Sequence, residues 1–177
     1  MATDLKCCTD FLRAVGTEKI EHSDEGFFAH LVAVYRDLQR WGEEEPVCLA
    51  GMFHSIYGTE KFRHFALSIE RRGEVRELIG ERAERIAYLN CALVRSTFDA
   101  LVTGSRPLWV VDRLTDDPVP LSEQDFQDLV TVHLADWLEQ VPRSKEWDYR
   151  RDAYRAMAEH LGGIALESFD RVYALAT

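Results

Sequence analysis

Three histidines and one aspartate fall on the apolar faces of predicted helices, where a polar side chain is costly unless it is bound. They are His30, His54, His133 and Asp136, drawn from three separate helices. A buried imidazole or carboxylate needs a hydrogen-bonding partner or a metal ion, and histidine is the commonest metal ligand. Because bundle cores build metal sites from facing helices, the pattern predicts one divalent transition metal held by these four residues. Iron, manganese, zinc and copper all suit such ligands.

The apolar stretch before His54 ends in a polar turn. Pro46 suits the first turn of a helix, where no backbone N–H is needed, and Gly58 is a stop signal. Val47, Ala50 and His54 are spaced by three and four, so His54 shares their inward face. A histidine at the inner end of a buried helix, followed by hydroxyls and a carboxylate, indicates a metal or substrate site. The plainer alternative is a hydrogen-bonded core histidine.

The residues around this turn supply the candidate catalytic and substrate-binding groups. Glu60 is the best candidate general base, with an exposed turn residue as the equal alternative. Tyr57 and His22 are the other catalytic candidates, and they would orient the substrate. For His22, and for His64 below, the alternative is an ordinary surface histidine. Substrate binding is predicted for three further residues: Ser55, Thr59 and His64.

Helical periodicity accounts for most of the chain that must position these groups. Apolar residues spaced by three and four, with Gly stops, predict helices over 4–15, 24–41, 46–57, 61–68, 73–79, 81–102, 122–138, 147–161 and 164–175. The β-prone run 108–111 and the turn 115–118 predict a small hairpin within 107–120, which is the only strand signal. The expected fold class is therefore all-α, with one small β-hairpin insertion.

Composition limits the class of protein. The 177 residues fit one domain, and 46% apolar with 29% charged residues is ordinary for a globular protein. A net charge of −10 argues against nucleic-acid binding, which usually needs clustered Lys and Arg. Without a leader or a long apolar run, we expect a cytoplasmic protein with no membrane contact. The four cysteines form no C-x-x-C pair, and of the neighbours Cys7 and Cys8 one is expected inside and one outside.

The order of the inward polar residues resembles the HD-domain superfamily of all-α metalloenzymes. His30 is similar to the first histidine of that pattern, the run 49–54 to its second element, and Leu134-Ala135-Asp136 to its last. The resemblance covers about residues 25–140 and looks strongest toward the hydrolase domain of the ppGpp-hydrolase family. It implies one HD-like bundle over 1–177, with C-terminal helices at 146–175. It also implies a metal-dependent phosphohydrolase, commonly with manganese, whereas HD-like proteins such as myo-inositol oxygenase hold iron pairs and activate oxygen.

The chain departs from that pattern at two places. Ser55 stands where the superfamily has the aspartate that follows the second histidine, and a hydroxyl is a poor ligand. The loss predicts one metal ion on His30, His54 and Asp136, with His133 as a replacement ligand. The acidic pair of the ppGpp hydrolases is also missing, because Gly58 and Thr59 occupy its positions.

Three classes of function remain open from the sequence. The first is a metal-dependent enzyme acting on a small molecule, by hydrolysis of a phosphate or related ester or, as the alternative, by iron- or copper-dependent oxygenation. The second is a metal-free HD-like binding module, for which Ser55 is the main argument. The third is a helical interaction protein whose inward histidines are a coincidence. We expect a small-molecule substrate as partner, and a homodimer stays open.

Overall fold

The chain folds into helices with short hairpins, so the prediction of an all-α protein with a small β-hairpin is confirmed. The computed structural model describes residues 4–22 and 25–175, without the side chains of 21, 22 and 25. The helices in chain order are α1 (Leu5–Ala14), α2 (Phe27–Trp41), α3 (Glu45–Phe53), α4 (Arg72–Ile79), α5 (Glu81–Ala92), α6 (Arg95–Val102), α7 (Glu123–Gln140), α8 (Arg151–Leu161) and α9 (Gly163–Leu175). Single 3₁₀ turns are η1 (Thr17–Lys19), η2 (Ile69–Arg71) and η3 (Val141–Arg143).

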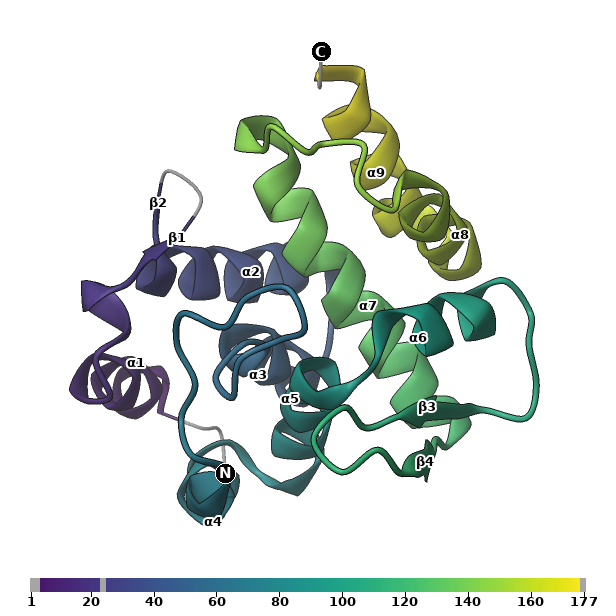
Figure 1. Cartoon of the computed structure of the whole chain (residues 1–177). Coiled ribbons are helices and arrows are strands. Elements are labelled where there is room, and N and C mark those ends of the chain that lie inside the picture. The colour runs from purple at the N-terminus through teal and green to yellow at the C-terminus, as the bar shows by residue number, and fades with distance from the viewer. Residues whose placement is uncertain (1–3, 23–24, 176–177) are drawn as a thin grey trace.

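The central helix is α3, which lies between α2, α5 and α7 (Figure 1). Every residue from Val47 to Phe53 is buried, and the helix is apolar on all sides, as is typical of a core helix. A polar group at its end therefore lies in the protein interior. α3 is nine residues long, and none of the described helices combines the length and apolarity needed to cross a bilayer.

Gly51 allows α3 to approach α2 closely. A Cβ atom at this position would lie 2.2 Å from Cδ1 of Leu38 and 3.3 Å from Cγ1 of Val34. The first distance is far inside van der Waals contact, so a side chain here would displace Leu38 or separate the helices. The close approach brings the end of α3, and with it His54, against His30 of α2.

Helix ends follow the capping signals of the sequence. The Asp4 side chain accepts a hydrogen bond from the Lys6 backbone at the start of α1. Ser122 and Asp125 form a reciprocal capping box at the start of α7. Gly42 closes α2 with a φ of 82°, a left-handed conformation that favours glycine. The last two caps fix the start of α7 and the end of α2, which both contribute to the site described below.

The predicted helix over 81–102 is wrong in one respect, because it is split into α5 and α6. Strands β3 (Trp109–Val111) and β4 (Pro118–Pro120) form the predicted hairpin. Its backbone pairs with the chain at the split: Val94 N–H donates to the Val111 carbonyl, and Arg113 N–H donates to the Ala92 carbonyl. Leu93 is extended as a result. A pairing with a distant segment thus overrides the local helical pattern.

The predicted helix over 61–68 is also wrong, because this segment is a loop. Gly58 adopts a φ of 71° and turns the chain back. Thr59 N–H then donates to the Phe62 carbonyl, and Leu67 N–H donates to the Ile56 carbonyl. The loop folds over the end of α3 and forms one wall of the site described below.

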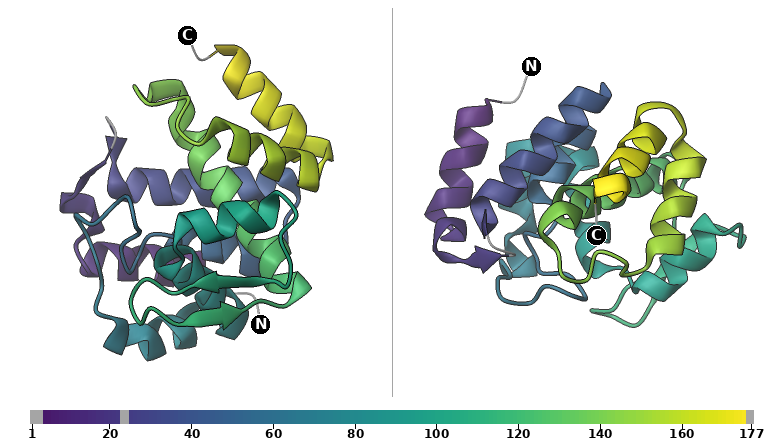
Figure 2. Two further views of the ribbon diagram at one scale, coloured as in Figure 1. Left: turned by 45° about the vertical axis from the view of Figure 1, so that its right-hand side comes forward. Right: turned by 90° about the horizontal axis from the view of Figure 1, so that it is seen from above.

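A second small hairpin, absent from the sequence prediction, precedes α2. Strands β1 (Glu21–His22) and β2 (Glu25–Gly26) pair antiparallel over two residues each. The predicted helix from 24 therefore begins instead at Phe27. At the other end of the chain, α8 and α9 lie side by side against α7 (Figure 2). α8 starts at Arg151, later than predicted, because Arg150 is left-handed with a φ of 48°.

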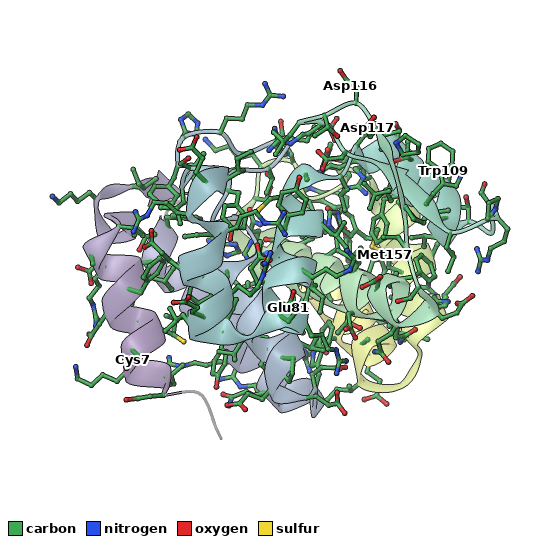
Figure 3. All side chains as sticks on the ribbon, turned by 90° about the horizontal axis from the view of Figure 1, so that it is seen from below. Cys7, Glu81, Trp109, Asp116, Asp117 and Met157 are labelled. Carbon is green, nitrogen blue, oxygen red and sulfur yellow. The ribbon has the colours of Figure 1, made fainter. Side chains whose placement is uncertain are left out.

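The adjacent cysteines of α1 lie on opposite sides of the helix, as predicted. Cys8 is fully buried, and Cys7 is on the outer surface (Figure 3). Burial raises the pKa of the Cys8 thiol to about 11. A thiol with so high a pKa is a structural residue rather than a nucleophile.

Candidate metal centre

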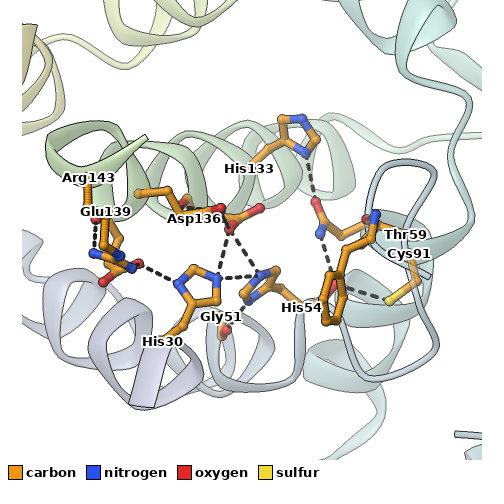
Figure 4. A network of polar contacts seen from close by, with 12 residues as sticks. His30, Gly51, His54, Thr59, Cys91, His133, Asp136, Glu139 and Arg143 are labelled. Carbon is orange, nitrogen blue, oxygen red and sulfur yellow. Dashed lines mark hydrogen bonds and ion pairs between the residues drawn. The ribbon is translucent and has the colours of Figure 1, made fainter. Parts of the chain in front are cut away.

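Three helices bring His30, His54 and Asp136 together in the protein interior (Figure 4). His30 lies in α2, His54 directly follows α3, and Asp136 lies in α7. The two imidazole Nε2 atoms are 3.3 Å apart, and each is 3.1 Å from Oδ1 of Asp136. Both imidazoles are fully buried, and Asp136 is 8% exposed. Within residues 4–22 and 25–175, this is the group of His, Cys, Asp and Glu whose ligand atoms converge closely enough for a metal ion.

The spacing of the three donor atoms suits a single ion. Metal–ligand bonds of about 2.0–2.2 Å, with angles of about 90–110°, place neighbouring ligand atoms about 2.8–3.6 Å apart. The observed distances of 3.1 and 3.3 Å fall within this range. Two imidazoles and one carboxylate leave further coordination positions for water or substrate. The group could therefore hold a metal ion.

The second ring nitrogen of each imidazole is held by an acceptor. His54 Nδ1–H donates to the Gly51 carbonyl at 2.7 Å, which leaves the Nε2 lone pair facing the other donors. His30 Nδ1–H donates to Glu139, whose carboxylate also accepts from Arg143 at 2.5 Å. Metal-binding histidines usually donate their other N–H to a carbonyl or carboxylate in this way, which fixes both tautomer and ring orientation. The surroundings thus prepare the two Nε2 atoms as ligands.

Without a metal, a proton holds this group together. Burial lowers the pKa of His30, but its hydrogen bonds and attraction to Asp136 and Glu139 outweigh burial and raise it to about 9. Burial raises the pKa of Asp136, but the charges and hydrogen bonds of His54 and His30 outweigh burial and hold it well below its usual range. The protonated His30 can donate from Nε2 toward the charged Asp136. Metal binding would replace this proton.

A cavity of about 310 Å³ opens beside Asp136. Of the predicted substrate-binding residues, Ser55, Thr59 and His64 all border it. Ser55 is 5% exposed and directly follows His54. The volume is at the lower end of the range for small-molecule pockets. The structure thus brings the three predicted substrate-binding residues to one cavity next to the candidate metal centre.

Part of the chain is similar to one known protein family. Residues 11–95 are similar to a domain of unknown function, DUF6817. The DUF6817 match includes His30, Gly51 and His54, and it ends before α7 contributes Asp136. No curated protein and no solved structure matches the chain. Two of the three donor residues therefore lie in the segment that is similar to DUF6817, and the match assigns no function.

His133, the fourth predicted ligand, lies outside both the DUF6817 match and the donor group. Its Nδ1–H donates to Oδ1 of Asn90 at 2.8 Å, and its Nε2 accepts from Arg150 at 3.0 Å. Both ring nitrogens are therefore occupied by protein groups. Burial, reinforced by the charges of Arg150 and Arg95, lowers the pKa of His133 well below its usual range. The neutral ring is a structural element of the core, and the metal-ligand prediction for it is corrected.

His133 supports the site indirectly through Asn90. The Asn90 side chain donates from Nδ2 to the His54 carbonyl at 2.9 Å while its oxygen accepts from His133. Cys91 Sγ lies 3.1 Å from the same carbonyl. This carbonyl follows the last turn of α3 and has no helical partner of its own. α5, which lies within the DUF6817 match, thus holds the backbone of a candidate ligand.

Two of the predicted catalytic residues, Glu60 and Tyr57, are bound to other parts of the protein. The Glu60 carboxylate accepts from the backbone N–H of Arg95 at 2.8 Å, at the start of α6, and it does not border the cavity. Tyr57 is buried and donates to Glu84 at 3.0 Å; burial, with the charge of Glu84, raises its pKa. The side chain of His22 lies outside the described residues. The structure therefore gives Glu60 and Tyr57 capping and core roles.

Several residues at the site were missed from the sequence. Glu139 is three residues after Asp136 on the same helix, so its position on the inward face could have been found from spacing. Gln140 donates to Oδ1 of Asp136 at 2.7 Å, and it had no periodic signal because it ends the helix. Lys61 and Arg95 border the cavity from a loop and a helix start, where sequence spacing indicates no partner.

Proposed function

We propose that the chain is an HD-like, metal-dependent enzyme that hydrolyses a phosphate or related ester of a small molecule. The observation that carries the proposal is the convergence of two imidazole nitrogens and one carboxylate oxygen within 3.3 Å of one another. Their order along three helices agrees with the resemblance to the HD-domain superfamily. The anchored Nδ1 atoms and the adjacent cavity give further support.

The residues around the donors divide the work of binding and orientation. A divalent ion bound there would acidify a water molecule and polarise the ester oxygen. Asp136 is the donor that borders the cavity, so the substrate approaches from its side. Gln140 fixes the orientation of the Asp136 carboxylate through its hydrogen bond at 2.7 Å. The Ser55 hydroxyl, at the cavity wall, can donate to or accept from a water or substrate oxygen.

We propose a single ion rather than two. The carboxylate that would bridge a pair of ions is replaced by Ser55, and a hydroxyl is a weak ligand. Within the described residues, the donor group contains no second carboxylate that borders both imidazoles. Two histidines and one carboxylate are a sufficient set for a catalytic ion with open positions.

The test is metal content together with ester hydrolysis. Protein purified without a histidine tag should carry about one transition-metal ion per chain, or take one up after treatment with a chelator. Hydrolysis of p-nitrophenyl phosphate, and of its diester, should depend on that metal. His54→Ala and Asp136→Asn should lose both properties, while His160→Ala, at an exposed histidine outside the site, should keep them. Absence of metal uptake by the wild type would overturn the proposal.

A second candidate is an iron-dependent oxygenase, favoured by the donor set itself. Two histidines and one carboxylate on one face of an ion are the ligands of many non-haem iron oxygenases. The same protein, loaded anaerobically with Fe(II) and then exposed to air, separates the two activities. Oxygen consumption that is abolished in His54→Ala would favour the oxygenase. Ester hydrolysis with Mn or Zn and no oxygen uptake would favour the hydrolase.

A further inference from the structure

Arg95 is a half-buried cation on the cavity wall without a carboxylate partner among the described residues. Its guanidinium Nη1 donates to the Tyr149 hydroxyl at 3.0 Å. The carboxylate of Glu60 accepts from the backbone N–H of Arg95 and not from its guanidinium. An arginine that is partly removed from water normally has an anionic partner, because most of its five N–H donors are otherwise left without an acceptor.

Lys61 reaches the same wall from the loop that folds over α3. Its Nζ lies 3.9 Å from the centre of the Tyr149 ring and 5.5 Å from that of Trp137. Tyr149 is therefore shared by both cations: its hydroxyl accepts from Arg95, and its ring lies under Lys61. One aromatic side chain thus holds two positive charges at the edge of one cavity.

The charge of Lys61 is balanced by a group that can be displaced. Its Nζ is 2.5 Å from Oε2 of Glu146, whose side chain is 68% exposed and also borders the cavity. Exposed ion pairs of this kind are weak, because water and salt screen them. A ligand oxyanion entering the cavity can therefore take the place of Glu146 on Lys61 while it pairs with Arg95.

We infer that Arg95 and Lys61 form an oxyanion subsite, which binds a carboxylate or phosphate group that the substrate carries in addition to its reacting group. Guanidinium binds both kinds of oxyanion through paired N–H donors, and an ammonium adds a point charge. The cavity wall also carries the carboxylates of Asp136 and Glu146, so the attraction for an anion is local to the two cations. As a description of substrate, the inference rests on the proposed function, but anion binding itself does not need the metal.

The first experiment measures anion binding to metal-free protein. Inorganic phosphate and acetate are titrated separately after treatment with a chelator, and binding is followed by calorimetry or by NMR shifts of the Arg95 and Tyr149 amides. Arg95→Gln should weaken binding by about tenfold or more, since it removes a charge-assisted pair of hydrogen bonds. Lys61→Gln should weaken it by a smaller factor. The anion that binds more tightly identifies the chemical class of the group that the subsite binds.

A third variant gives an effect of opposite sign. Glu146→Gln frees Lys61, so the anion should bind about two- to fivefold more tightly. Arg63→Gln and Lys145→Gln remove the same charge from exposed residues nearby that do not border the cavity, and they should leave binding unchanged. Equal weakening in these controls, or unchanged binding in Arg95→Gln, would overturn the subsite.

The same titration distinguishes failure of the subsite from failure of the proposed function. His54→Ala should retain anion binding, because the cations are independent of the donors. If the wild type takes up no metal but binds the anion through Arg95, the enzyme proposal fails and the subsite stands. If the wild type takes up metal and Arg95→Gln binds the anion as well as the wild type does, the subsite fails and the enzyme proposal stands. Circular dichroism of each variant confirms that it is folded.

Discussion

His30 and Glu139 join α2 to α7 through one imidazole nitrogen, and the other nitrogen of the same ring faces His54 and Asp136. The carboxylate of Glu139 therefore sets which way the imidazole points. It is itself held by Arg143. Negative charge on Glu139 is favoured, because His30 and Arg143 outweigh the effect of burial and lower its pKa.

We expect Glu139→Gln to weaken metal binding by about 10- to 100-fold, as is usual for a partner that orients a ligand. The glutamine amide can still accept a hydrogen bond from His30. The loss of metal affinity would therefore measure the effect of the Glu139 charge on the basicity of His30 rather than a change in packing. The measurement is competition with a chromophoric chelator. Glu159→Gln, at an exposed carboxylate paired with Arg155, is the matched control. Equal affinity in the two variants would contradict the role of Glu139.

Gly51→Ala should reduce both stability and metal affinity. The added methyl would meet Leu38 and force α3 away from α2, at a cost of about 1–3 kcal/mol. The same displacement would separate the Nε2 atoms of His30 and His54. Thermal unfolding and chelator competition measure the two effects. Gly73→Ala in α4, where a Cβ would meet nothing within 4 Å, should be neutral or stabilising by about 0.4–1 kcal/mol.

Ser55→Asp should lower the stability of the metal-free protein without adding a second ion. The new carboxylate would stand at a position that is 5% exposed, and an unpaired buried group costs at least about 1–3 kcal/mol. Ser55→Ala removes the hydroxyl without adding charge and serves as the control. Metal analysis gives the stoichiometry. Two ions per chain in Ser55→Asp would show instead that the cavity retains the ligands of a two-metal site.

Stability should fall in acid because of His133. Its pKa in the folded protein is lowered by burial, by the charges of Arg150 and Arg95 and, more weakly, by His54, and only the attraction to Asp136 opposes this. In the unfolded chain the pKa is about 6.5, so below this pH the unfolded state binds more protons. Each unit of pH below about 6.5 should cost up to about 1.4 kcal/mol of unfolding free energy.

His133→Gln should flatten this dependence. A glutamine can still accept from Arg150 and donate to Asn90, but it does not titrate. Urea unfolding of wild type and variant at several values of pH between 4 and 8 gives the two slopes. An equally steep loss of stability in His133→Gln would place the acid sensitivity in other groups.

The helical core was predictable because its signal is local. Periodicity located α1, α2, α7 and α9, and the apolar run before His54 identified the central helix. His30, His54 and Asp136 were found because each is a polar residue on an otherwise apolar face. The fold class follows from the same signal.

The predictions that were wrong concern features that depend on contacts between segments far apart in the sequence. Periodicity placed His133 and Asp136 on one inward face, but it could not indicate that Asn90 and Arg150 would occupy both nitrogens of His133. The split between α5 and α6 depends on backbone bonds to the hairpin, which helical propensity does not contain. Arg95 and Lys61 are polar residues in expected polar positions, so nothing local marks them as cavity residues.

The donors of the candidate metal centre come from α2, α3 and α7, which lie far apart along the chain. An unfolded chain cannot hold these three groups together, so it has no site of comparable affinity for the ion. Each tenfold rise of free metal above the dissociation constant should therefore add about 1.4 kcal/mol to the unfolding free energy. Hydrogen exchange of the backbone amides in the middle of α7 should slow by the same factor of ten. The ion would then be a reversible cross-link that holds α2, α3 and α7 together.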